Sequence, residues 1–270
     1  MRFTFILVTA FLSLSCCNTE TVKPLPHRVG PHRPIVKTPQ KNCDKKPIVV
    51  AVIDTGFGLD TMDLKVKLCK FGHKDFSGDE TTTKFGTTDP VPLDKHGHGT
   101  HIAGIIDELA SKTGVNYCLV ILKYYKEDNF GEANLRGTIQ AINYAKNIHA
   151  DYINYSGGGS MKNDEEVKAV KEYLDAGGKF VAAAGNEGVN LDYMHFYPAQ
   201  DDPRVIVVGA VDKDGKRLSM SNYGKDVTRT ELGKDVPVCG ENMCMKMTGT
   251  SQAAATATGK LVAQEKNACN

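Results

Sequence analysis

The sequence predicts an α/β fold of three layers, in which a mostly parallel β-sheet is covered by helices on both faces. From Pro47 onward, short runs rich in β-branched residues alternate with turns and with segments of helical periodicity. This alternation is typical of parallel strands joined by helices. The strand candidates are almost continuously apolar, as expected for strands buried on both faces. They comprise residues 48–53, 117–122, 152–155, 180–184 and 205–210.

Two helices between these strands have clear signatures. Over residues 132–149, apolar side chains recur at steps of three and four residues and therefore share one face. Over residues 164–176, Asn163 is a candidate N-cap, acidic residues occupy the first turn, and Gly177 follows the last turn. Both segments have the length of helices that cross between parallel strands.

Length and composition predict a single globular domain over residues 47–270. The chain has 270 residues, of which 41% are hydrophobic, enough for one sizeable core. Its 33 basic and 32 acidic residues nearly cancel. This balance excludes nucleic acid as a partner, and we expect a monomer.

The N-terminal segment predicts export. Residues 1–17 place one Arg ahead of a short apolar run and then small residues, the layout of a secretory signal. This run is too short to span a bilayer, and no later segment is long enough to form a transmembrane helix. The Leu-Ser-Leu-Ser-Cys-Cys ending also resembles a bacterial lipoprotein box, which leaves open a lipid anchor at Cys16 or Cys17. We therefore expect a secreted or cell-envelope protein in which residues 18–46 form a proline-rich tether.

The cysteines favour disulfides, because the chain is predicted to leave the cytoplasm. Cys239 and Cys244 are close enough in sequence to close a local loop. The pattern does not decide the other pairings, and buried free cysteines stay open as an alternative. The six that remain after the predicted leader are Cys43, Cys69, Cys118, Cys239, Cys244 and Cys269.

Asp54 ends the first predicted strand, within Val-Ile-Asp-Thr-Gly. The carboxyl ends of buried strands are where α/β folds place functional groups. An Asp before Thr-Gly can also simply begin a turn. The same letters fit the loop of aspartic proteases, but no second Asp-Thr-Gly or Asp-Ser-Gly follows, so that hypothesis requires a homodimer.

His98 lies between two glycines in Asp-Lys-His-Gly-His-Gly-Thr-His (94–101), directly before a helix of small residues. A general base needs an exposed approach with little backbone around it. The alternative is a metal site formed by Asp94, His96, His98 and His101. We predict no metal, because the glycines leave the first two histidines on pliable backbone.

Ser251 lies where a Gly-Thr turn enters a helix of small side chains, and Asn186 lies in a glycine-flanked loop after a buried strand. A serine at a helix N-terminus is close to backbone N–H groups that stabilise an oxyanion, although it can also be an ordinary N-cap. An Asn at such a loop can donate a hydrogen bond to the same oxyanion, or merely shape a turn.

Together and in this order, the Asp, His, Asn and Ser segments closely resemble the subtilase family of serine proteases over residues 47–265. The resemblance implies a subtilisin-like fold and a secreted serine endopeptidase acting through an acyl-enzyme. It also implies a catalytic triad of Asp54, His98 and Ser251, with Asn186 as oxyanion donor. The strand that binds extended protein or peptide substrates is implied at Ser156, Gly157, Gly158 and Gly159.

Departures from the family pattern shape further expectations. Ala255 stands where the family has Pro, and Gly157 stands where it commonly has Leu. The connection over residues 109–116 is too short for the loop that binds the strongest calcium of bacterial subtilisins. The segment before Asp54 is too short for an inhibitory propeptide domain. We expect chemistry without a cofactor, only weak support for structural calcium, and disulfides in its place as the device that slows unfolding.

Overall fold

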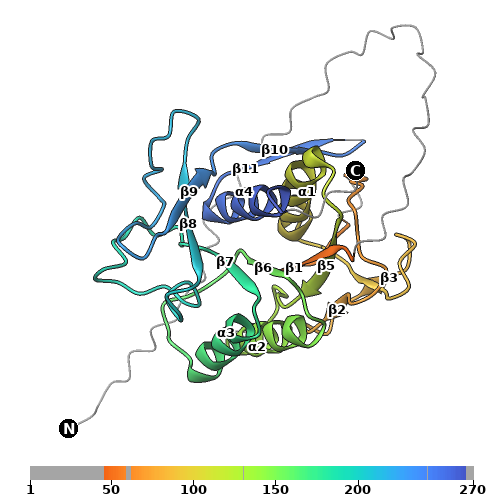
Figure 1. Ribbon diagram of the computed structural model, residues 1–270, viewed down its shortest axis with the longest axis horizontal. Helices are drawn as coiled ribbons and strands as arrows, with labels where there is room; N and C mark the ends of the chain where they lie inside the picture. Colours follow the sequence, from red (N-terminus) through yellow and green to blue (C-terminus); the bar gives the residue numbers. More distant parts are fainter. Residues whose placement is uncertain (1–45, 59–61, 130, 242, 266–270) are drawn as a thin grey trace, which may run out of the picture.

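The computed structural model describes residues 46–58, 62–129, 131–241 and 243–265. The predicted leader, and the tether throughout the range 18–45, lie outside them. The centre of the structure is a seven-stranded sheet, in which all neighbouring strands run parallel (Figure 1). Across the sheet the order is β2 (Lys74–Asp75), β5 (Tyr117–Lys123), β1 (Ile48–Asp54), β6 (Tyr152–Tyr155), β7 (Lys179–Ala183), β8 (Ile206–Val211) and β9 (Arg229–Leu232).

Helices cover both faces of this sheet, which confirms the predicted three-layer α/β fold (Figure 1). On one face lie α1 (His98–Ala110), followed by the 3₁₀ turn η1 (Ser111–Thr113), and α4 (Thr250–Ala263). On the other lie α2 (Gly131–Asn147) and α3 (Asp164–Asp175). None of the described helices is long and apolar enough to cross a membrane.

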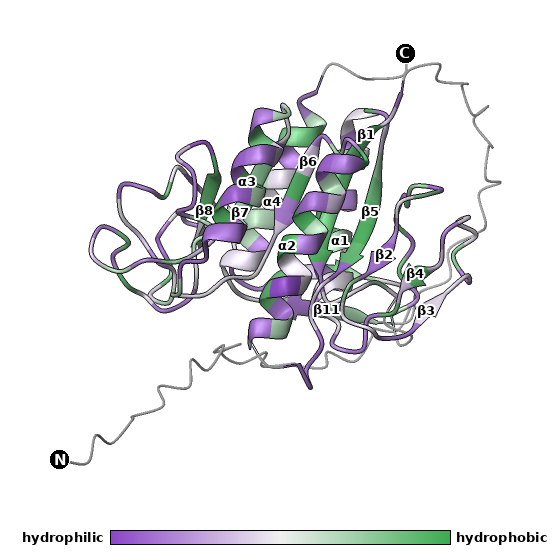
Figure 2. Ribbon diagram, turned by 90° about the horizontal axis from the view of Figure 1, so that it is seen from below, coloured by the Kyte–Doolittle hydropathy of each residue, from purple (hydrophilic) through white to green (hydrophobic). Residues whose placement is uncertain are grey.

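Two hydrophobic cores follow from the alternation of side chains along the strands. In β1, Val50 and Val52 pack in the cluster formed with α1 and α4. Ala51 and Ile53 pack in the cluster formed with α2 and α3. Figure 2 shows the result, with apolar β1 and β5 inside and hydrophilic residues on the outer surfaces of α2 and α3.

The small side chains of α4 let this helix lie close to both α1 and the sheet. A Cβ atom added at Gly259 would lie 2.8 Å from the Cβ of Leu109 in α1. On the opposite side, the Thr258 hydroxyl donates a 2.8 Å hydrogen bond to Asn154 of β6. Since almost all of α4 is buried, larger side chains would push it away from its neighbours.

The strand order reverses at β1. The connection through α1 places β5 on one side of β1, and the connection through α2 returns the chain to β6 on the other side. Such a reversal opens a crevice at the carboxyl ends of the strands, where α/β proteins bind ligands. Asp54, the last residue of β1, lies at this crevice.

The sequence did not predict the short strands at the periphery. These include the antiparallel pairs β3 (Thr81–Thr82) with β4 (Val91–Pro92), and β10 (Val236–Cys239) with β11 (Cys244–Met247). The structure contains disulfides Cys69–Cys118 and Cys239–Cys244, so the predicted local loop closure is confirmed. Cys43 and Cys269 lie outside the described residues.

Candidate active site

Asp54 and His98 form a close pair although 44 residues separate them. Nδ1 of His98 lies 2.7 Å from Oδ1 of Asp54, and both side chains are largely buried. The backbone N–H of Thr55 also donates to Oδ1 of Asp54, at 2.8 Å. The carboxylate is therefore oriented from two directions, with Nδ1–H of His98 as one donor.

Glycines allow the end of β1 and the start of α1 to approach each other this closely. A Cβ atom at Gly99 would lie 2.3 Å from the carbonyl oxygen of Gly56. Gly97, the N-cap of α1, has a φ of 91°, in the left-handed region that favours glycine. The two glycines that flank His98 in the sequence are therefore steric requirements of the pair.

Asp94 holds the loop before His98 through five hydrogen bonds. Its Oδ1 accepts from the N–H groups of His96 and Gly97 and from the Thr55 hydroxyl. Its Oδ2 accepts from the N–H and the hydroxyl of Thr100. Burial opposes ionisation of Asp94, but these bonds outweigh it, so its pKa is lowered. The Thr55 hydroxyl, which donates to Asp94, also accepts from the N–H of Gly99 at 2.8 Å and so connects the end of β1 to the start of α1.

The sequence suggested Asp94 only as an alternative metal ligand, and it did not indicate Thr55. The structure shows Asp94 accepting the N–H of Thr100, in the first turn of α1, together with the N–H groups of His96 and Gly97 just before this helix. His101 is directed elsewhere, because its Nε2–H donates to the carbonyl of Val236 at 3.0 Å. Among the described residues, no group of three or more His, Cys, Asp or Glu is arranged to hold a metal ion.

Opposite electrostatic environments act on the two buried histidines of α1. Burial disfavours the charged form of His98, but the negative charge of Asp54 and the hydrogen bond to it outweigh burial, so the pKa of His98 is raised. For His101, burial and then the nearby charge of His98 lower the pKa to about 4. His98 thus takes up a proton more readily than an ordinary histidine, whereas His101 stays neutral at neutral pH.

Ser251 lies in the first turn of α4 and is buried. Its hydroxyl donates to the carbonyl oxygen of Ser156 at 3.1 Å, and the Ser156 hydroxyl donates to the carbonyl of Ser251 at 3.2 Å. Nδ2 of Asn154 donates to the Ser156 hydroxyl at 3.1 Å. The structure thus joins the predicted nucleophile to the start of the predicted substrate strand.

Asn186 follows β7 and faces the start of α4. Its Oδ1 accepts from both the N–H and the hydroxyl of Thr250, each at 2.9 Å. Since these donors fix the oxygen end of the amide, the Nδ2 end is left to donate. Thr250, which the sequence did not single out, therefore orients the predicted oxyanion donor beside Ser251.

The predicted substrate strand is not equally open along its length. The N–H and the carbonyl of Gly159 both pair with Tyr197, at 2.9 and 2.7 Å. Gly157 lies under Tyr124, because a Cβ atom there would be 2.3 Å from the Tyr124 hydroxyl. Gly159 is therefore already paired within the chain, and the backbone before it is the part left for a peptide.

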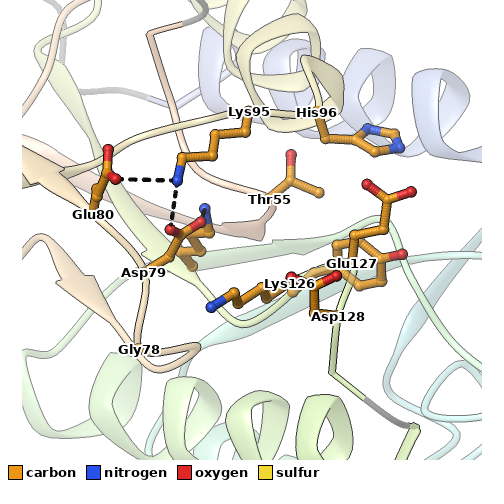
Figure 3. Close-up of a pocket in the computed structure, with 11 residues that line it drawn as sticks. Thr55, Gly78, Asp79, Glu80, Lys95, His96, Lys126, Glu127 and Asp128 are labelled. Carbon is orange, nitrogen blue, oxygen red and sulfur yellow. Dashed lines mark hydrogen bonds and ion pairs between the residues drawn. The ribbon is translucent and has the colours of Figure 1, made fainter.

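A hollow adjoins the Asp54–His98 pair, lined by their sequence neighbours Thr55 and His96 (Figure 3). On one wall Asp79 accepts from Lys95 at 2.9 Å and from Lys123 at 2.8 Å. These contacts, chiefly the hydrogen bond from Lys123, hold the pKa of Asp79 far below its usual range. Lys123 stands beside Asp54 in the β1–β5 register, so this ion pair supports the floor of the site.

The fold and this arrangement define the class of α/β serine hydrolases, with an Asp–His pair at the switch point and a serine at a helix N-terminus. The chain matches the Subtilase family over residues 45–268. It belongs to that family and is a serine-type endopeptidase.

Similar proteins agree with this placement. The chain is 33% identical over 238 residues to the Major intracellular serine protease of Bacillus subtilis (strain 168), covering 84% of this chain and 72% of that protein. It is 32% identical over 220 residues to Subtilisin DY of Bacillus licheniformis, covering 78% of this chain and 74% of the relative.

Solved structures agree on the fold. A cold adapted subtilisin-like serine proteinase matches with a TM-score of 0.65 and 25% identity, over 81% of this chain and 76% of the other. The epidermin leader peptide processing serine protease from Staphylococcus aureus matches with a TM-score of 0.67 and 21% identity, over 81% of this chain and 65% of the other.

Proposed function

We propose that this subtilase is an exported endopeptidase whose catalytic triad is Asp54, His98 and Ser251. The observation that carries the proposal is the 2.7 Å contact between His98 and Asp54 at the switch point of the sheet. This contact leaves Nε2 of His98 as the ring nitrogen that can accept a proton. Ser251 supplies a hydroxyl at the N-terminus of α4, which packs against the helix of His98.

In the proposed reaction, Ser251 attacks the substrate carbonyl while Nε2 of His98 takes the hydroxyl proton. His98 then gives this proton to the departing amine, and water hydrolyses the acyl-enzyme by the same route. Asp54 holds His98 in the required tautomer and stabilises its charged form. Because the Ser251 hydroxyl rests on the carbonyl of Ser156, it has to rotate toward His98 first.

The tetrahedral intermediate carries a negative oxygen that needs donors. Asn186 and the backbone N–H of Ser251 are the proposed pair, and the amide orientation fixed by Thr250 supports this role. We propose that the substrate is an extended segment of unfolded or looped protein, lying along Ser156–Gly158 as an added strand. This chemistry needs no cofactor.

Export is the second part of the proposal, based on residues 1–17. The disulfides Cys69–Cys118 and Cys239–Cys244 support it, since such bonds persist in oxidising compartments. Mass spectrometry of the mature N-terminus after cell fractionation tests it. Removal of the leader supports export, and acylation at Cys16 or Cys17 supports a lipid anchor. An unprocessed protein in the cytoplasm would contradict it.

A fluorophosphonate probe tests the triad. Folded wild-type protein should be labelled and Ser251→Ala should not, while Ser111→Ala in η1 serves as a matched control that keeps full labelling. Casein cleavage that resists both a chelator and pepstatin separates this mechanism from metal and aspartic chemistry. A folded wild type without Ser251-dependent labelling would overturn the proposal.

A further inference from the structure

The aromatic ring of Phe196 spans a gap between two glycines. A Cβ atom added at Gly158 would lie 2.4 Å from Cε1 of Phe196, and one added at Gly185 would lie 3.0 Å from Cδ2. These two ring atoms are at opposite corners, so the ring bridges the space from one glycine to the other. Both glycines have positive φ, at 151° and 96°, so neither position readily accepts a side chain that would displace the ring.

These glycines belong to the two segments that flank Ser251. Gly158 comes two residues after Ser156, whose carbonyl binds the Ser251 hydroxyl. Gly185 precedes Asn186, and its N–H donates to the Thr250 hydroxyl at 3.2 Å. The gap that Phe196 fills therefore opens beside the nucleophile, between the proposed substrate strand and the proposed oxyanion donor.

Hydrogen bonds hold the backbone on both sides of Phe196 and thereby fix the position of the ring. The N–H of Phe196 donates to the side-chain oxygen of Gln200 at 2.9 Å. Gln200 in turn donates to Asp226 at 2.5 Å and to the carbonyl of Leu191 at 3.1 Å. On the other side, Tyr197 pairs with Gly159 through two hydrogen bonds.

A substrate carbonyl placed against Ser251, with its oxygen toward Asn186, puts the preceding Cα atom between the two flanking segments. The side chain of that residue, the P1 residue, then points into the gap that Phe196 occupies. The residual space also has a carboxylate, because Oε2 of Glu187 would lie 2.6 Å from a Cβ at Gly185. Large side chains meet the ring, and acidic ones meet a like charge.

We propose that Phe196 determines specificity by restricting the P1 residue to glycine, alanine or serine. This inference rests on the proposed function, since it takes Ser251 as the nucleophile and Asn186 as the oxyanion donor. The ring contributes bulk and touches no reacting atom of the enzyme. Forcing a large side chain into a filled site typically costs about 1–3 kcal/mol, which corresponds to about a tenfold to hundredfold loss of kcat/KM.

Internally quenched peptides that differ only at P1 test the inference. Wild type should cleave after Gly, Ala or Ser at least about tenfold faster than after Leu, Phe or Glu, measured as kcat/KM. Phe196→Ala should gain cleavage after Leu and Phe while it keeps cleavage after Ala. Tyr193→Ala, a change of an 82% exposed aromatic in the same loop, should keep the wild-type ranking.

The outcomes separate this inference from the function on which it rests. A wild type that is labelled at Ser251 but cleaves after Phe as fast as after Ala overturns the role of Phe196 alone. A wild type that is neither labelled nor able to cut any peptide overturns both. Phe196→Leu, which keeps an apolar side chain, provides a second variant if the alanine variant does not fold, and it should also gain cleavage after Leu.

Discussion

The hydroxyl groups of Ser251 and Ser156 each donate to the other residue's carbonyl oxygen, at 3.1 and 3.2 Å. This reciprocal pair fixes the first turn of α4 to the chain leaving β6. It also gives the Ser251 hydroxyl a definite resting partner. The proposed nucleophile is consequently held in place before a substrate arrives, by a hydrogen bond that its hydroxyl has to leave before it can attack.

Asp54→Asn should lower kcat about 10⁴-fold, the effect of the equivalent change in another serine protease, because the amide no longer holds the productive tautomer of His98. Wild-type activity should fall as the pH drops through the raised pKa of His98, since only the neutral ring accepts the proton. Without the negative charge, the residual activity should persist to lower pH. Asp212→Asn, in a distant turn, is the control for kcat against pH. An unchanged kcat in Asp54→Asn would contradict the role of this pair.

Asp79→Asn should destabilise the fold by about 3 kcal/mol, because it removes the anion that the buried Lys123 ammonium contacts. Replacing both residues, as Asp79→Asn with Lys123→Met, should recover most of this loss. Urea unfolding provides the measurement. Glu241→Gln, at the exposed ion pair with Lys65, should change stability little. If Asp79→Asn and Glu241→Gln lowered stability equally, burial of the Asp79–Lys123 pair would be unimportant.

Glu166→Gln should remove a loss of stability that occurs as the pH rises. Burial, and then the charge of Asp201, raise the pKa of Glu166 to about 8 from an ordinary value of 4.5. Between these pH values the folded protein retains a proton that the unfolded chain releases, so stability falls with rising pH. Each unit of pKa difference corresponds to about 1.4 kcal/mol.

Melting temperatures at pH 5 and pH 8 measure this effect. Wild type should lose stability between the two, and Glu166→Gln should lose less. Glu165→Gln alters the exposed neighbour in the same helical turn and should follow wild type. The burial explanation fails if both variants follow wild type.

Loss of the Cys69–Cys118 disulfide should cost more stability than loss of Cys239–Cys244. The first closes 49 residues and the second 5. Loop-closure entropy then gives about 4 kcal/mol for the first and about 2 kcal/mol for the second. Paired Cys→Ser variants, compared by urea unfolding, should show this order. The reverse order would mean that native-state contacts, rather than the unfolded chain, decide the difference.

The central sheet was predictable because most of its strands are nearly continuous apolar runs, which can be recognised in the sequence itself. The apolar run at 152–155 coincides with β6, and β1 and β5 each extend one residue beyond prediction. The β10–β11 hairpin was missed because its strands have only four residues each, too few for their alternation of buried and exposed positions to stand out in the sequence. Such short strands acquire their structure from the surfaces they contact.

The candidate site was likewise predicted only in part. Asp54 was predicted from its position at the end of a buried strand and His98 from its flanking glycines, and the structure brings them together. Thr55 and Asp94 were missed as supports because their hydrogen bonds join segments distant in sequence. Phe196 was missed for the same reason, since its importance depends on two glycines from different loops.

Gly99 shows how contact between backbones constrains the chain. It carries no functional group, yet even a methyl group there would overlap the carbonyl of Gly56 and force the end of β1 away from α1. A comprehensive substitution screen should therefore find Gly99 to be as intolerant of substitution as the residues that perform chemistry. His96, with its ring at the hollow, should accept many replacements. Intolerance in such a screen would report the fit between two backbones as readily as it reports a reactive side chain.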